Sequence, residues 1–146
     1  MFKRVLFPVD LAEPASWRHA LPVAIDEARG AGATLYVLTV LPAFSAQISQ
    51  HFAPTAREKL RAASVAELAD FVAKHVPQGL ACQQVVSEGT IYKEIISAAE
   101  AIDADLIVMA SHKPDAVRDF LLGANAAQVV RHCPRSVLIV RAKTGA

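Results

Sequence analysis

The chain has 146 residues and a formal net charge of +1, and it is 53% hydrophobic and 20% charged. The length fits a single domain over residues 1–146, and the apolar content argues against long disordered stretches. The near-neutral charge excludes proteins that bind nucleic acids through an extended basic surface.

The sequence also predicts a cytoplasmic protein that is not embedded in a membrane. The longest apolar runs, such as Leu106–Ala110, are far shorter than a bilayer span. Pro8 and Asp10 interrupt the first apolar run, which argues against a signal peptide. Cys82 and Cys133 lack the spacing of a disulfide framework or a zinc site, so both are expected to be reduced.

Short apolar runs that suit buried strands alternate with longer segments of helical periodicity. In chain order the expected elements are a strand over 5–10, a helix over 14–29, a strand over 34–40, a helix over 55–76, a strand over 81–87, a helix over 91–102, a strand over 106–110, a helix over 125–132 and a strand over 137–140. This alternation predicts an α/β fold with three layers, in which helices cover both faces of an open, doubly wound, parallel five-stranded sheet. The usual strand order is 3-2-1-4-5, and ligands bind at its switch point, beyond the carboxyl ends of the strands.

Local signals mark the boundaries of the first two helices. Gly30 is expected just past the end of the first helix. Thr55 and Glu58 fit a capping box at the start of the second helix, and Pro77 closes it. The spacing of apolar residues predicts an inner face for this second helix that carries Leu60, Ala63, Leu68, Phe71 and Val72.

Two segments are too long for simple connections. Residues 41–54 are expected to form either a lid or contact surface, or a variable surface insertion. The second segment is 112–122, which follows the fourth expected strand.

Candidate binding residues converge on the predicted switch point. Asp10 follows the first strand, where capping of the next helix and ligand binding are equally compatible with a carboxylate. Gly123, Ala124 and Asn125 open the last helix, where they form either an anion site or a plain helix cap. His112 and Lys113 are either cationic ligand contacts or solvated loop residues.

Several catalytic patterns are missing from the sequence. It contains no GxxxxGK[ST] loop, no GxGxxG after the first strand, no GxSxG elbow and no HExxH pair. The five histidines are scattered without carboxylates at metal-binding spacing. The residues therefore favour a binding site over a catalytic one, and neither a catalytic nor a metal-ligating residue is assigned.

Together these motifs identify a resemblance to the universal stress proteins, a family of small cytoplasmic Rossmann-like domains. The similarity covers essentially the whole chain. It is carried by Val5–Asp10, Gly89–Ile95, Ala104–His112, Leu121–Ala127, Val129–His132 and Ser136–Arg141.

The resemblance implies ATP binding, although this chain departs from the family's Gly-x2-Gly-x9-Gly-Ser/Thr pattern. Ala110 and Lys113 stand at the first two glycines, Gly123 is kept, and Ala124 replaces the hydroxyl residue. Ala-Ser-His-Lys-Pro at 110–114 followed by Gly-Ala-Asn is similar to a subgroup with ATP-binding members. Loss of the hydroxyl at Ala124 removes one donor, worth about 0.5–1.5 kcal/mol net.

The resemblance also implies roles for individual residues. Pro8, Val9 and Asp10 would border the adenosine, and Val40 would pack on the adenine. The ribose and phosphates would be lined by Ala110, Ser111, His112 and Lys113, and phosphate would be bound by Gly123, Ala124 and Asn125. A Mg²⁺ or Mn²⁺ ion would bind through the phosphates.

The expected protein is a homodimer, joined through Ser136–Arg141 at the sheet edge, that responds to ATP and regulates a partner in the stress response. A transporter or an enzyme would suit the partner role. Two alternatives remain: an interaction module that binds no nucleotide, and a slow ATPase with His112 as its candidate base.

Overall fold

The central strand of the sheet is β1 (Arg4–Pro8), in which Val5, Leu6 and Phe7 are fully buried. The computed structural model describes residues 1–43, 54–111 and 122–142. Parallel to β1 lie β2 (Thr34–Pro42) on one side and β4 (Leu106–Ala110) on the other. The edge strands are β3 (Cys82–Gly89) and β5 (Ser136–Val140). The order β3-β2-β1-β4-β5 confirms the predicted fold.

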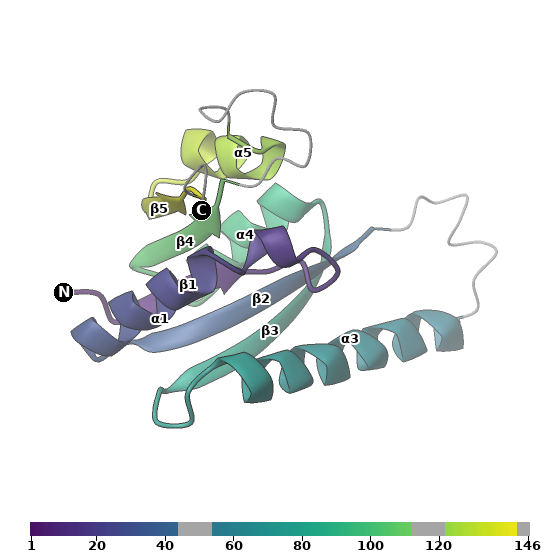
Figure 1. Cartoon of the computed structure of the whole chain (residues 1–146). Coiled ribbons are helices and arrows are strands. Elements are labelled where there is room, and N and C mark those ends of the chain that lie inside the picture. Colours follow the sequence, from purple (N-terminus) through teal and green to yellow (C-terminus); the bar gives the residue numbers. More distant parts are fainter. Residues whose placement is uncertain (44–53, 112–121, 143–146) are drawn as a thin grey trace.

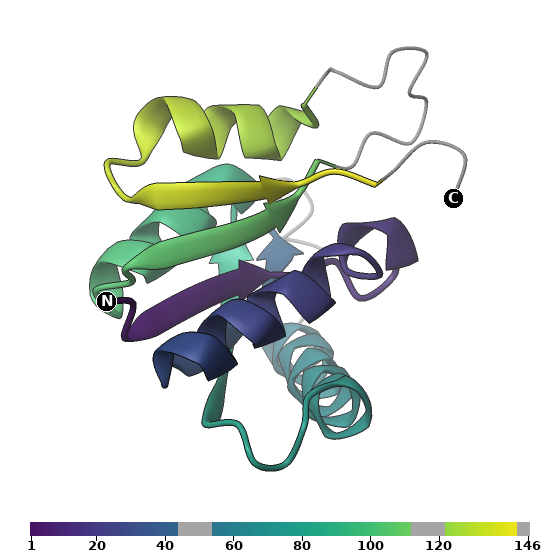
Figure 2. The same cartoon turned by 60° about the vertical axis from the view of Figure 1, so that its left-hand side comes forward.

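Two layers of helices enclose this sheet (Figures 1 and 2). The first layer consists of α1 (Ala20–Ala31) and α3 (Pro54–His75), and the second of α4 (Ile91–Ala101) and α5 (Ala124–His132). Alternate residues of each strand point to opposite faces. Val5 and Phe7 accordingly join the core under α1 and α3, whereas Leu6 joins the core under α4 and α5.

The first helical segment differs from the prediction at both ends. A 3₁₀ turn, η1 (Pro14–Ser16), precedes α1. Glu13 is the N-cap residue of this turn, and its carboxylate accepts a hydrogen bond from the amide of Ala15. The predicted continuous helix over 14–29 is therefore wrong. Gly30 lies inside α1, and Gly32 ends the helix instead, with a left-handed φ of 66° that glycine adopts without steric cost.

The start of α3 also differs from the prediction. The helix begins at Pro54, so Thr55 is already helical and the predicted capping box is wrong. Proline suits the first helical position, because the amide hydrogen that it lacks has no acceptor within the helix there.

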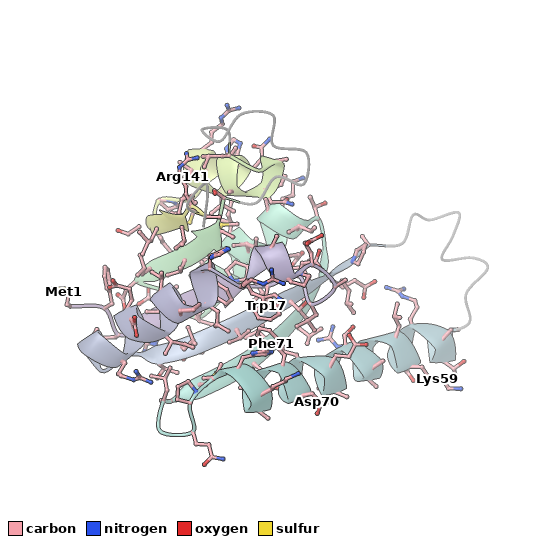
Figure 3. The ribbon with its side chains drawn as sticks, in the orientation of Figure 1. Met1, Trp17, Lys59, Asp70, Phe71 and Arg141 are labelled. Atoms are coloured by element: carbon pink, nitrogen blue, oxygen red, sulfur yellow. The ribbon has the colours of Figure 1, made fainter. Side chains whose placement is uncertain are left out.

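Only the second half of α3 packs on the sheet. Leu68 and Phe71 are buried, whereas Leu60 is 44% exposed and Ala63 is exposed, so the predicted inner face is wrong at those two positions. The helix extends past the end of the sheet, and Lys59 lies on this overhanging part (Figures 1 and 3). Leu60 and Ala63 lie on the first half of α3, where no described element covers them.

Polar contacts tie the overhanging half of α3 to the edge strand β3. Arg57 forms an ion pair with Glu88 at 2.7 Å, and Arg61 donates a hydrogen bond to the carbonyl of Val86 at 3.0 Å. At the other end of α3, the ring of Trp17 lies 5.2 Å from Phe71 and 4.6 Å from His75, centroid to centroid (Figure 3). The turn after β1 is thus packed directly against α3.

None of the helices in the described part of the chain is long and apolar enough to span a bilayer.

Candidate functional site

A cleft with a volume of about 310 Å³ lies at the carboxyl ends of β1, β2 and β4. Its walls come from η1, from the start of α4 and from the start of α5. Figure 2 shows η1 and the start of α5 at the same end of the sheet. This end of the sheet is the switch point of a doubly wound fold, where ligands generally bind.

The cleft brings together most of the residues predicted to bind a ligand. These are Pro8, Val9, Asp10, Val40, Ala110, Gly123, Ala124 and Asn125. They come from four segments that are distant in the sequence, and the parallel strand order places those segments next to one another.

Three other predicted residues stand apart. Ser111 does not line the cleft, and its amide instead donates a hydrogen bond to the carbonyl of Val140 at 3.0 Å. His112 and Lys113 lie outside the described residues. Their roles therefore stay predictions.

A network of hydrogen bonds fixes the turn between β1 and η1. The Ser16 hydroxyl accepts from the amide of Asp10 at 3.0 Å and donates to the carbonyl of Asp10 at 2.9 Å. The Asp10 carboxylate accepts from the amide of Ala12 at 3.0 Å, and the Glu13 carboxylate accepts from the amide of Ala15 at 3.3 Å. Asp10 therefore caps its own turn rather than α1, and its backbone is held in place at the cleft.

The start of α5 lines the cleft with residues whose backbone amides have no acceptor among the described residues. Gly123 is the N-cap residue, with φ −59° and ψ 155°, a conformation open to any residue. The first amide to bond within the helix is that of Ala127, which donates to the carbonyl of Gly123 at 2.9 Å. The amides of Ala124, Asn125 and Ala126 precede it and have no acceptor inside the helix. Asn125 is thus the second helical residue, not the first as predicted.

Free amides at a helix start attract anions, because they carry the positive end of the helix dipole. No side-chain cap occupies the start of α5 within the described residues. The arrangement therefore leaves hydrogen-bond donors available to a phosphate or carboxylate at this end of the cleft.

Sequence reasoning missed more than half of the lining residues that the structure describes. The missed residues are Glu13, Ser16, Leu38, Thr39, Pro42, Ile91, Ile95, Met109 and Ala126. Leu38 and Met109 lie near the carboxyl ends of the strands, so the strand register would have suggested them. Glu13 and Ser16 enter only because the 3₁₀ turn folds back over the strand ends, and no local sequence pattern predicts that turn.

The chemistry of the cleft is mixed. Apolar side chains such as Val40, Ile91 and Ile95 offer a surface for a flat or aliphatic group. Asp10 and Glu13 add carboxylates on the η1 side, and α5 adds backbone donors. This combination suits a ligand with an apolar body, hydroxyl groups and one anionic end.

Comparison with known proteins identifies relatives across the chain. A model of the Universal stress protein family matches residues 1–141. Universal stress protein G of Shigella flexneri is 33% identical over 149 aligned residues, which cover 97% of this chain and 100% of that protein.

Solved structures share the fold. A universal stress protein in complex with cAMP superposes with a TM-score of 0.66 at 21% identity, covering 97% of this chain and 98% of that one. The universal stress protein from Archaeoglobus fulgidus in complex with dAMP also gives a TM-score of 0.66, at 20% identity, covering 95% and 98%.

Proposed function

The chain belongs to the universal stress protein family, and we propose that it binds an adenine nucleotide in the cleft at the carboxyl ends of β1, β2 and β4. The observation that carries the proposal is the meeting of two features in one cleft: apolar side chains around Val40 and the free amides of Ala124, Asn125 and Ala126. A nucleotide needs both, because its base is flat and apolar on its faces and its phosphate is anionic. The cAMP and dAMP complexes of proteins with the same fold support this assignment.

In the proposed complex the base lies against Val40 and Ile91, and the phosphate accepts hydrogen bonds at the start of α5. Asp10, with Pro8 and Val9 before it, borders the sugar. ATP is the nucleotide that the resemblance to the family implies. A Mg²⁺ or Mn²⁺ ion would enter with its phosphates, and the carboxylates of Asp10 and Glu13 are the charged oxygens that the described lining offers it.

We further propose that the protein acts as a dimeric regulator. Among the residues that the structure describes, β5 pairs with β4 alone, and Val137, Leu138, Ile139 and Val140 are each only partly buried. Pairing of β5 with a second copy would cover this apolar edge. Nucleotide binding would then alter how the dimer contacts a partner protein, such as a transporter or an enzyme.

Calorimetric titration tests the binding proposal. Nucleotide-free protein, prepared by unfolding and refolding, is titrated with AMP, cAMP and ATP, and adenine-free ribose 5-phosphate serves as the control ligand. We expect saturable binding of at least one adenine nucleotide and none of ribose 5-phosphate. Absence of heat and of thermal stabilisation at millimolar nucleotide would overturn the proposal.

Sedimentation equilibrium tests the dimer. We expect a mass of two chains at micromolar concentration, whereas a monomer throughout this range would refute pairing through β5. Measuring the mass with and without nucleotide separates assembly from ligand binding.

A further inference from the structure

A second cavity lies between α1 and α3, on the outer side of the helical layer that these two helices form. This cavity, the α1–α3 groove, has a volume of about 350 Å³, and none of its described lining residues belongs to the cleft at the strand ends. Residues between Trp17 and Asp26 line one side, and His75 of α3 lines the other. Figure 3 shows Trp17 between the two helices. The volume is that of a small binding site.

The floor of the groove is apolar and aromatic. Leu21 and Ile25 are buried members of the core that also line the groove. The rings of Trp17 and His75 lie beside them, 4.6 Å apart from centroid to centroid. Such a surface suits an aliphatic or aromatic side chain, because it offers apolar area and flat ring faces together.

The indole nitrogen of Trp17 is a buried donor without an acceptor. In the described part of the chain, it is the one buried side-chain nitrogen or oxygen that has no hydrogen-bond partner. Its edge-to-face neighbour Phe71 has no acceptor atom in its side chain. Buried polar groups are generally satisfied, so this donor in the wall of a cavity points to an acceptor that binds there. Because the Trp17 residue is only partly buried, a small rotation of its side chain would present the N–H to the groove.

Two opposite charges flank the apolar floor. Arg18 and Asp26 both line the groove and are exposed, and neither forms an ion pair with another described residue. The hydrogen bond from the Leu21 amide to the Trp17 carbonyl extends the helical geometry of α1 back to this end. At a rise of about 1.5 Å per residue, Arg18 and Asp26 therefore lie about 12 Å apart along the helix axis.

This spacing matches an extended peptide. Alternate side chains of a strand point to the same side, and with a rise of about 3.3 Å per residue the first and fifth lie about 13 Å apart. An acidic side chain at one end would meet Arg18, a basic one at the other end would meet Asp26, and a central apolar one would lie over the floor. An extended chain also has free carbonyls for the Trp17 N–H, whereas the carbonyls of a helix are bonded internally.

The 3₁₀ turn η1 connects this groove to the cleft at the strand ends. Ser16 lines the cleft, and the next residue, Trp17, is the C-cap of η1 and lines the groove. A segment bound in the groove would therefore contact the turn that borders the proposed nucleotide site. This position suits the partner contact of a nucleotide-dependent regulator.

From these observations we infer that the α1–α3 groove binds an extended segment of a partner protein. In this segment an apolar residue is flanked, two positions away on either side, by an acidic and a basic residue. The apolar side chain packs on Leu21 and Ile25, and the charged side chains pair with Arg18 and Asp26. The inference rests on the proposed regulator role, since it names the surface that the partner contacts, but it does not depend on nucleotide binding.

NMR titration of the full ¹⁵N-labelled chain tests the inference, with the peptide Glu-Ala-Leu-Ala-Lys, blocked at both ends, as the probe. The chain has one tryptophan, so the indole N–H of Trp17 gives a single signal. We expect saturable binding at millimolar peptide and a downfield shift of this signal, because the N–H gains an acceptor. The peptide Glu-Ala-Ala-Ala-Lys should bind at least about fivefold more weakly, since it buries less apolar surface.

Charge reversal tests the pairing of the two ends. Asp26→Lys should weaken binding of Glu-Ala-Leu-Ala-Lys about twofold to fivefold and strengthen binding of Glu-Ala-Leu-Ala-Glu by a similar factor. Asp70→Lys is the matched control, because it makes the same change of charge on the exposed face of α3, and it should leave both dissociation constants unchanged.

Several outcomes would overturn the inference and leave the proposed nucleotide binding standing. These are absence of peptide binding, an indole signal that does not move, and equal binding of the leucine and alanine peptides. Equal effects of Asp26→Lys and Asp70→Lys would also overturn it. Absence of nucleotide binding in the calorimetric titration would refute that proposal alone, because the peptide titration is made without nucleotide.

Discussion

Ser16 and Asp10 bond to each other twice across the turn that follows β1: the Ser16 hydroxyl accepts from the Asp10 amide at 3.0 Å and donates to the Asp10 carbonyl at 2.9 Å. Both residues line the cleft. The Ser16 side chain in η1 therefore holds the backbone of Asp10, just after the end of β1. This pair fixes one wall of the proposed nucleotide site.

Removal of the Ser16 hydroxyl should loosen that wall. We expect Ser16→Ala to weaken nucleotide binding about fivefold, the equivalent of about 1 kcal/mol, because Asp10 is no longer held. The free energy of unfolding should fall by less than about 1 kcal/mol, since water replaces the lost bonds at this exposed turn. Calorimetry and urea unfolding measure the two effects. Ser97→Ala, on the exposed face of α4, is the control, and an equal loss of affinity there would contradict the assignment.

A carboxylate introduced at the start of α5 should lower nucleotide affinity without lowering the free energy of unfolding. Ala124→Glu places negative charge where the phosphate is proposed to lie, so nucleotide affinity should fall at least about tenfold. The same charge complements the helix dipole and should leave stability unchanged or raise it by about 0.3–1 kcal/mol. Ala124→Gln has nearly the same shape without the charge and should retain most of the affinity. Unchanged binding by Ala124→Glu would place the phosphate elsewhere.

Truncation of two leucines on α3 should lower the free energy of unfolding by very different amounts. Leu68 is fully buried, so Leu68→Ala should cost about 2–5 kcal/mol of unfolding free energy. Leu60 is 44% exposed on the overhanging half, so Leu60→Ala should change that free energy by less than about 0.5 kcal/mol. Urea unfolding of both variants checks the difference. Similar losses would indicate that the overhanging half is covered in solution.

Gly89 should not tolerate a side chain. Its φ is +150°, and a β-carbon there would lie 2.5 Å from Oε1 of Glu94. We expect Gly89→Ala to lower the unfolding free energy by about 1–3 kcal/mol, through backbone strain and the clash with Glu94. Gly79→Ala is the matched control, because a β-carbon there meets nothing within 4 Å, and its effect should be neutral or stabilising. In the double variant Gly89→Ala/Glu94→Ala, only the part of the loss due to the clash should be recovered.

Acid should weaken the contact between the N-terminus and the turn before β4. Oδ2 of Asp105 accepts hydrogen bonds from the amides of Lys3 at 2.6 Å and Arg4 at 2.8 Å, and these bonds, that of Lys3 first, lower the pKa of Asp105. The stability that it contributes is therefore present above the pKa of an unfolded aspartate, about 3.9, and is lost as the pH falls through the lower folded value.

Unfolding by urea between about pH 6 and pH 2, roughly two units on either side of the ordinary aspartate pKa, measures this dependence. Asp105→Asn should reduce stability above the ordinary aspartate pKa and flatten the decline below it. Asp70→Asn, on the exposed face of α3, should reproduce the wild-type curve. An unchanged decline in Asp105→Asn would assign the acid sensitivity to other carboxylates.

The sequence by itself determined the fold and the location of the cleft. The runs around Val5–Phe7 and Leu106–Met109 are apolar at consecutive positions, because a parallel strand covered on both faces buries every side chain. Alternation of such runs with helical segments permits few topologies, and the observed order is the expected one. Eight of the predicted site residues line the cleft for the same reason, since the carboxyl ends of parallel strands meet at one edge.

Only the tertiary structure decided the rest. Helical periodicity identified one apolar side of α3, but burial also depends on whether another element covers that side, and Leu60 stays 44% exposed. Glu13 and Ser16 entered the cleft through a 3₁₀ turn, and Thr39 through its place in the strand register. Periodicity records which residues share a side of an element. The contacts that this side makes depend on the lengths and packing of elements far away in the chain.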